Sequence, residues 1–141
     1  MSQFVETSAV SHELALRIIE AAIAEGAKGG LPVAVAVCDP ALGLVAYARA
    51  DGTTPHSAET SRRKAQTSAS TRRPSGWMAP ELAQMLPAGS DNILTNIAGG
   101  LPLRFDGRFV GGFGVAGGAP DRDAEIARAV LQQIGADPVE G

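Results

Sequence analysis

The sequence predicts a single α+β domain, residues 1–141, in which helices flank a central antiparallel sheet. Only four residues, 40–43, connect the first two predicted strands, and so short a connection requires an antiparallel hairpin. Asp106-Gly107 lies between two later β-like segments and is a favoured two-residue hairpin turn. A chain of 141 residues is long enough to bury one core without disulfides or metal.

The N-terminal half is predicted to form a helix, a hairpin and a second helix. Ser11 can cap the first helix, and Gly26 is expected to end it. Segments 31–39 and 44–50 have the β-branched and alternating pattern of strands. The second helix begins near Ser57 and ends before Pro74. Its inward face is a stripe of small residues, which would let it approach a sheet or a partner closely: Ala58, Ser61, Ala65, Ser68 and Ala69.

The C-terminal half is predicted to contain a short helix, three strands and a final helix. Pro80 is a favoured first helical position, and that helix should run to about Leu86. Strands are expected at 93–97, 101–105 and 108–116, with a break at Gly99-Gly100. The last helix should start around 121–123 and bury an apolar face made of Ile126, Ala127, Val130, Leu131 and Ile134.

Residues 112–117 match the dinucleotide-binding pattern G-x-G-x-x-G. That pattern binds a pyrophosphate only where a parallel strand ends and a helix begins. Here the strand returns from a hairpin turn, Pro120 separates it from the final helix, and no strand follows to carry an acidic ribose ligand. We therefore reject a nucleotide site and expect the strand glycines to allow close backbone packing.

Composition excludes several classes of partner. Twelve Lys and Arg against fifteen Asp and Glu give a net charge of −3, which disfavours nucleic acid and anionic membranes. The N-terminus has no signal-peptide pattern and the longest apolar run, 31–38, is too short to span a bilayer, so a cytoplasmic location is expected. The low charged fraction of 19% favours a homo-oligomer. The single cysteine, Cys38, is predicted to be a buried small hydrophobe.

Several segments together resemble the GlcG/HbpS-like family of haem-binding or haem-degrading proteins, which includes the C-terminal domain of PduO-type adenosyltransferases. The segments are "GLPVAVAVCD" with "LVAYARADG", "RKAQTSA", "IAGGLPL", and "GRFVGGFGVAGG" followed by "DAEIARA". The resemblance implies a profilin-like or roadblock-like sandwich with about five strands, in the order α-β-β-α-α-β-β-β-α. It also implies a homo-oligomer whose candidate cofactor is haem. The chain departs from the family pattern at Ala50, Ala98 and Ala116.

The candidate catalytic residues lie on or near the second helix. Five of the twelve basic residues fall within positions 62–73, and a cluster of this kind can clamp carboxylates or haem propionates. Lys64 matches the family's K-A-x-T motif and is the first candidate, with Arg63 as an anion ligand. His56, with Glu59 one turn on, could act as an acid or base near neutral pH. The alternative is that this charged segment is only a solvated helix face.

Further ligand contacts are expected from two loops. Arg49 and Asp51 flank the end of the second strand and could face a cleft beside Lys64, or could form a loop-fixing ion pair. Gly117 and Gly118 could offer backbone N–H groups at the rim of a pocket. No His or Cys spacing typical of a metal site is present, so no metal is assigned.

The sequence thus favours a homo-oligomeric protein that binds a small anionic ligand, with haem or another tetrapyrrole as the first class. A second hypothesis is a cofactor-independent hydratase, isomerase or lyase acting on a small carboxylate, with Lys64 or His56 as acid or base. A third is an assembly module without a ligand cleft.

Overall fold

A computed structural model of the chain describes residues 1–140 and shows four helices and four strands in one α+β domain. The sheet has the order β2-β1-β4-β3, and all three strand pairs are antiparallel. Along the chain the elements are α1 (His12–Lys28), β1 (Ala34–Cys38), β2 (Leu44–Arg49), α2 (Ser57–Thr71), α3 (Pro80–Gly89), β3 (Gly100–Phe105), β4 (Arg108–Ala116) and α4 (Pro120–Gln133).

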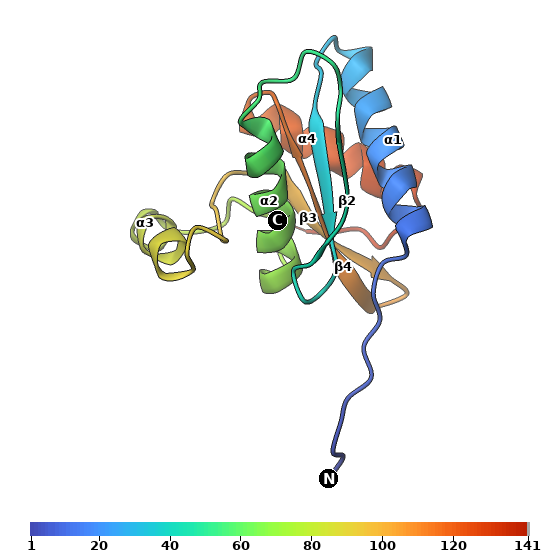
Figure 1. The fold of residues 1–141 in the computed structure, drawn as a ribbon, viewed down its shortest axis with the longest axis vertical. Helices are drawn as coiled ribbons and strands as arrows, with labels where there is room; N and C mark the ends of the chain where they lie inside the picture. The colour runs from blue at the N-terminus through green and yellow to red at the C-terminus, as the bar shows by residue number, and fades with distance from the viewer. Residues whose placement is uncertain (141) are drawn as a thin grey trace.

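The sheet is covered on both faces (Figure 1). Helices α1 and α4 pack together on one face, over a main core to which β1, β3 and β4 contribute Val35, Val37, Leu101, Leu103 and Phe113. Helix α2 covers β1, β3 and β4 on the other face. A smaller cluster of small side chains lies beneath α2: Ala36, Cys38, Ala65 and Ala69. Cys38 is fully buried there, as predicted.

The hairpin that ends in the glycine-rich strand forms as expected. Asp106 and Gly107 both adopt positive φ, 51° and 79°, and Phe105 pairs with Arg108 across the turn. Positive φ at both central residues is the geometry of a type I′ turn, which Asp-Gly favours. Strand β4 is therefore antiparallel to both its neighbours, and the parallel unit required by a dinucleotide site is absent from residues 1–140.

The small-residue stripe of α2 lies directly against the glycines of β4. A Cβ atom added at Gly112 would lie 2.7 Å from the Ala69 nitrogen, and one at Gly114 would lie 2.7 Å from the Ala65 nitrogen. Such distances are shorter than van der Waals contact, so only glycine permits this helix-to-sheet separation. The close contact fixes the position of α2, from which the candidate residues Glu59, Arg63 and Lys64 project.

The strand predicted at 93–97 is wrong, and the sheet has four strands rather than about five. The segment is a loop that leads from α3 back to β3. Its polar groups form hydrogen bonds with α2 and with the segment before α3, not with a neighbouring strand. The Thr95 N–H donates to Thr67 Oγ1 at 2.9 Å, and Asn96 Oδ1 accepts from the Met78 N–H at 2.8 Å. The element order is consequently α-β-β-α-α-β-β-α.

Three predicted boundaries also move. Helix α1 continues past Gly26 to Lys28, because Gly26 is buried where the helix passes Leu31 and Val33. Strand β3 starts at Gly100, and the predicted break is confined to Gly99, which has φ of 129°. Helix α4 starts at Pro120 itself, slightly before the predicted start.

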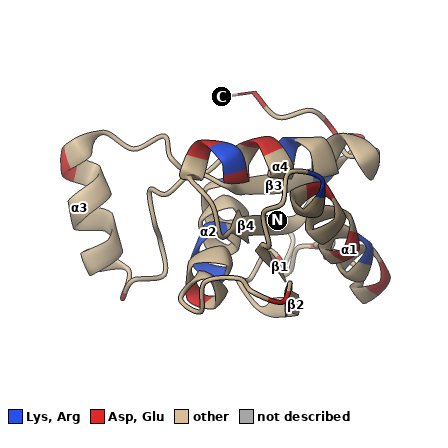
Figure 2. Cartoon of the chain, turned by 90° about the horizontal axis from the view of Figure 1, so that it is seen from above, with Lys and Arg blue, Asp and Glu red and all other residues tan. Residues whose placement is uncertain are grey.

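Helix α3 stands away from the rest of the molecule (Figure 1). None of its residues is buried, and Met85 is 70% exposed. Figure 2 shows that its only charged side chain is an acidic one, which is Glu81. We call the segment 76–98, which carries α3 and its two connections, the α3 arm. None of the helices in the described part of the chain is both long and apolar enough to cross a membrane.

Candidate functional site

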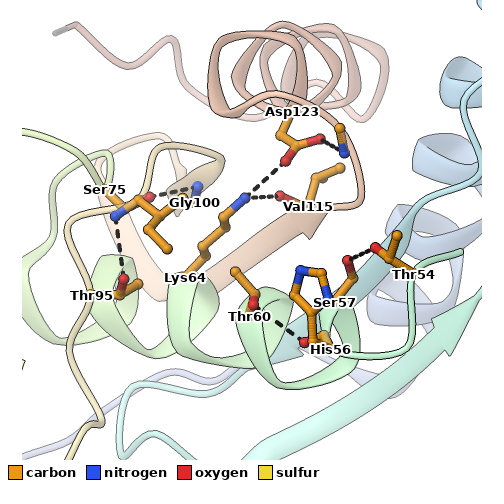
Figure 3. A network of polar contacts seen from close by, with 12 residues as sticks. Thr54, His56, Ser57, Thr60, Lys64, Ser75, Thr95, Gly100, Val115 and Asp123 are labelled. Carbon is orange, nitrogen blue, oxygen red and sulfur yellow. Dashed lines mark hydrogen bonds and ion pairs between the residues drawn. The ribbon is translucent and has the colours of Figure 1, made fainter.

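The Lys64 side chain runs from α2 into the interior, where its ammonium group is held at the end of β4 (Figure 3). It is only 1% exposed and is one of the largest fully buried side chains. Lys64 Nζ donates to the Val115 carbonyl at 2.8 Å and to Asp123 Oδ2 at 3.0 Å. Lys64 is therefore no part of a solvated helix face.

Asp123 is the buried partner of Lys64. It lies in the first turn of α4 and is 1% exposed. Its second oxygen, Oδ1, accepts the Gly118 N–H at 2.9 Å (Figure 3). One carboxylate thus joins α2, the turn after β4 and the start of α4. Burial lowers the pKa of Lys64 from its ordinary value, and the negative charge of Asp123 opposes that shift.

A cavity of about 320 Å³ opens beside this ion pair. An ammonium group has three N–H donors, and two of those of Lys64 are taken by Val115 and Asp123, so one remains for a ligand. The cavity is lined by Lys64 and Asp123 with residues from the start of α2, the 93–99 loop and the glycine turn: Thr54, His56, Ser57, Thr60, Ile97, Ala116, Gly117 and Gly118. We call this the Lys64 cavity.

Hydroxyl groups and one imidazole give the Lys64 cavity its remaining polar surface. Thr54 and Ser57 share a hydrogen bond of 2.6 Å between their side-chain oxygens. Thr60 Oγ1 donates to the His56 carbonyl at 3.3 Å, a long bond that a ligand could replace. His56 precedes the first turn of α2 and is exposed, so its ring is accessible from solvent.

The glycine turn contributes less than expected. Gly117 and Gly118 both line the Lys64 cavity, but the Gly118 N–H is already used by Asp123. That donor is not free for a ligand while the Asp123 contact is intact. Glycine is required at position 117 for a structural reason. Gly117 has φ of 141°, and a Cβ there would lie 2.7 Å from the Pro32 carbonyl oxygen.

Glu59 and Arg63 line a second cavity, also about 320 Å³, which we call the Arg63 cavity. The two cavities share Thr60 and Ile97 as lining residues, so they adjoin along one side of α2. Arg63 donates to Gln66 Oε1 at 3.1 Å and pairs with Glu59 at 3.2 Å. Because Glu59 is largely exposed, that ion pair is weak and leaves the guanidinium free to bind another anion.

Arg49 and Asp51 lie outside both cavities. Both are exposed, and neither forms an ion pair with any residue in 1–140. The sheet order explains their position: β1 separates β2 from β4, and Ala34 lies between Arg49 and Ala116 in the register. Two strand spacings, about 10 Å, therefore separate Arg49 from the end of β4.

The sequence reasoning missed Asp123 and the hydroxyls of Thr54, Ser57 and Thr60. A signal for Asp123 is present. With Ile126, Ala127 and Val130 it occupies the same i, i+3, i+4, i+7 stripe of α4, so a carboxylate lies on the buried face. A charged residue on such a face is rarely buried unless it is paired.

A larger cavity, about 480 Å³, lies on the other side of the 98–100 loop. Arg73, Trp77, Asp121 and Arg128 are among its lining residues. The Arg73 guanidinium stacks over the Trp77 ring at 4.4 Å from its centre, so the sole tryptophan contributes a flat apolar wall that is already covered by a cation. Within residues 1–140, no three His, Cys, Asp or Glu side chains come together as a candidate metal centre.

The chain is similar to a known family over most of its length. The sequence profile of the family described as "Haem degrading protein HbpS-like" matches residues 10–132. Protein GlcG of Escherichia coli strain K12 is 33% identical over 108 residues, which is 76% of this chain and 81% of that protein.

Solved structures share the fold. HbpS has a TM-score of 0.83 at 33% identity, covering 94% of this chain and 95% of that chain. Protein ORFY of Klebsiella pneumoniae has a TM-score of 0.86 at 20% identity, covering 95% and 96%. A structure described as a PduOC–haem complex has a TM-score of 0.84 at 21% identity, covering 94% and 99%. At these lower identities, the last two show the fold alone.

Proposed function

Because the chain belongs to the HbpS-like family, we propose that it binds haem or another anionic tetrapyrrole, as a homo-oligomer, at the two cavities beside α2. The observation that carries the proposal is the buried Lys64 ammonium, which lines the Lys64 cavity and has two protein acceptors for its three N–H donors. Family membership supports a haem-related ligand, and the cavities supply the chemistry that would hold it.

The two cavities offer one cation each for a ligand with two carboxylates. Lys64 lines one and Arg63 lines the other, and Thr60 with Ile97 forms the shared wall. Haem carries two propionate groups on one edge. Arg offers a planar fork that matches a carboxylate, and Lys offers a point charge. Each propionate would therefore meet its own cation, with the Thr60 hydroxyl between them.

The size of the cavities determines how such a ligand would lie. A volume of about 320 Å³ is near the lower end of small-molecule sites, so only the propionate edge would enter. The macrocycle would remain outside, against Ile97, which is 43% exposed. His56 is the histidine available at this cavity as an iron ligand. Bound haem would supply a redox-active iron.

A homo-oligomer would bury apolar side chains that are exposed to solvent in the single chain. The α3 arm exposes apolar side chains, and a helix of ten residues without a core partner is marginal in water. Its exposed apolar residues are Trp77, Leu82, Met85 and Ile97, and the outer strand β2 adds Leu44 and Tyr47. We propose that a second copy of the chain packs on the α3 arm, next to the Ile97 side of the site.

Hemin titration, followed by the Soret band, tests the ligand assignment. We expect a saturable shift that survives His56→Ala and is weakened about tenfold by Arg63→Gln, the effect of losing one charge-assisted hydrogen bond. Arg17→Gln on α1 removes the same charge from an exposed position far from α2 and should leave the affinity unchanged.

Two results would contradict the proposal. The absence of any saturable shift would exclude a tetrapyrrole ligand. Loss of the shift in His56→Ala, with Arg63→Gln unaffected, would replace propionate clamping by axial ligation of the iron.

The Lys64 cavity also favours a second function, a cofactor-independent reaction on a small carboxylate. A buried cation and an accessible imidazole line the same small space, which suits a substrate of a few carbon atoms. Lys64 would hold the carboxylate and His56 would move the proton. Glu59 lies in the adjoining cavity and takes no part in that arrangement.

Incubation with a panel of small hydroxy- and unsaturated carboxylates, followed by proton NMR in D₂O, tests this function. We expect deuterium exchange or turnover that is lost in His56→Gln and retained in Arg17→Gln. Exchange that persists in His56→Gln would exclude His56 as the acid or base.

A further inference from the structure

Three arginines lie near the end of α2 opposite the Lys64 cavity, and two of them stack on one aromatic ring. The Arg72 guanidinium lies 4.4 Å from the centre of the Phe109 ring, and the Arg104 guanidinium lies 5.6 Å from it. Arg108 precedes Phe109 on β4. Helix α2 has 15 residues, so about 22 Å separates this cluster from His56.

These arginines are not neutralised by the protein. Among residues 1–140, Arg72, Arg104 and Arg108 form no ion pair. Five other cations of the chain have carboxylate partners: Lys28 pairs with Glu25, Arg62 and Arg63 with Glu59, Lys64 with Asp123, and Arg122 with Glu125. A protein with a net charge of −3 thus leaves three positive charges close together.

Hydrogen bonds hold the cluster in place without using all of its donors. Arg104 donates to the Arg72 carbonyl at 3.2 Å, and Arg108 donates to Ser8 Oγ at 3.2 Å. The segment that carries Ser8 is itself anchored, since the Val10 N–H donates to the Val110 carbonyl at 2.9 Å. A guanidinium has five N–H donors, so each arginine retains several for a ligand.

A cavity of about 440 Å³, which we call the Arg72–Arg108 cavity, opens on this cluster. Its lining combines two of the arginines with hydroxyls and the aromatic ring: Thr7, Ser8, Pro40, Arg72, Arg108 and Phe109. One carboxylate, Glu6, also lines it. The nearby Asp39 carboxylate accepts from the Ala41 and Gly43 N–H groups, and that of Asp137 accepts from the Asp106 and Gly107 N–H groups, so both are engaged in turns.

From this geometry we infer that the Arg72–Arg108 cavity is a second binding site, for a small multivalent oxyanion bearing phosphate or carboxylate groups. Planar guanidinium forks match such groups in pairs, and the hydroxyls of Thr7 and Ser8 add neutral donors. The volume is that of a small organic ligand rather than a single inorganic ion. An anion would also relieve the repulsion between Arg72 and Arg108, the two cations that line the cavity. The inference does not depend on the Lys64 cavity.

Isothermal titration calorimetry with pyrophosphate and with citrate, on the intact protein, tests the inference. We expect saturable binding of one anion per chain for at least one of the two, weakened at least tenfold in Arg108→Gln and in Arg72→Gln. Arg17→Gln should bind as the wild type does. Preference for pyrophosphate would identify phosphate as the group recognised, and preference for citrate would identify carboxylate.

Two outcomes would overturn the inference. One is the absence of saturable binding of either anion at millimolar concentration. The other is equal weakening in Arg17→Gln and Arg108→Gln, which would show an effect of net charge alone. Because the hemin titration uses other residues, its failure would leave this result intact, and the reverse also holds.

Discussion

Lys64 and Asp123 each occupy the buried face of a helix, and each would be destabilising there alone. Lys64 lies with Ser57, Ser61 and Ser68 on the inward side of α2, and Asp123 lies on the apolar stripe of α4. Burying an unpaired charge costs several kcal/mol, whereas a paired and hydrogen-bonded charge costs far less. The ion pair therefore makes two otherwise unfavourable positions compatible, and it places one ammonium donor beside the cavity.

Removing either partner should strongly destabilise the protein. We expect Lys64→Met to lower the free energy of unfolding by about 3–5 kcal/mol, because Asp123 is then left charged and buried. Asp123→Asn should cost a similar amount, since it leaves the ammonium unpaired. Urea unfolding followed by circular dichroism measures both.

The double variant Lys64→Met/Asp123→Asn is the control for this prediction. Its cost should be clearly smaller than the sum of the two single costs, because no charge remains unpaired. Additive costs would mean that the two side chains are not energetically coupled.

At the scale of elements, the position of α2 depends on β4 having glycines where α2 crosses it. Gly112 and Gly114 let the backbone of α2 contact the backbone of the strand. This short separation brings Lys64 within reach of Val115 and Asp123. The glycine-rich sequence that resembles a nucleotide motif therefore acts through packing, not by binding phosphate.

Gly114→Ala should move α2 away from the sheet. The new Cβ would overlap the Ser61 carbonyl oxygen and the Ala65 nitrogen, and overpacking of this kind typically costs about 1–3 kcal/mol. Thermal unfolding should show a lower Tm, and hemin affinity should fall with it. Gly89→Ala is the matched control: nothing lies within 4 Å of its Cβ, so Tm should be unchanged or slightly higher.

The α3 arm gives a second prediction at this scale. Met85→Asp introduces a charge at a side chain that is 70% exposed, so the fold of one chain should be unaffected. If a second copy packs on the arm, the charge would be buried in the interface, and the assembly should dissociate toward monomer. Sedimentation velocity compares the mass of the variant with that of the wild type, and an unchanged mass would exclude the arm from the interface.

At the scale of the whole molecule, one buried thiol should contribute to the pH dependence of stability in alkaline solution. Burial raises the pKa of Cys38 from 9.0 to about 11, with Arg62 acting in the opposite direction. The folded state keeps the thiol proton after the unfolded state has lost it. The contribution to stability is therefore complete below pH 9 and lost as the pH rises to 11, and it amounts to about 2–3 kcal/mol.

Comparison of the wild type with Cys38→Ala isolates this contribution. The lowered pKa of Lys64 acts in the opposite sense, but it is common to both proteins and cancels in the difference. We expect the difference in unfolding free energy, wild type minus variant, to fall by about 2–3 kcal/mol between pH 8 and pH 11. A difference that is independent of pH would contradict the burial of the thiol.

The sequence by itself determined the elements whose signals are local. Apolar periodicity identified α1 and α4, the Asp106-Gly107 turn required β3 and β4 to pair antiparallel, and the segments "RKAQTSA" and "GRFVGGFGVAGG" with their order identified the family. It also placed Lys64, His56, Gly117 and Gly118 among the candidates, and the structure brings these four together around one cavity. Turn chemistry and helix periodicity act over a few residues, so they can be detected without the fold.

Tertiary structure alone decided the remaining features. The 93–97 segment has the composition of a strand, but Thr67 and Met78 take its hydrogen bonds, and those partners are up to 28 residues away. The Lys64–Asp123 pair spans 59 positions, and Arg108 meets Ser8 across 100. Which charges are buried, paired or left free depends on such distant contacts. The close packing of helices on the sheet creates these distant contacts, and no local sequence pattern predicts them.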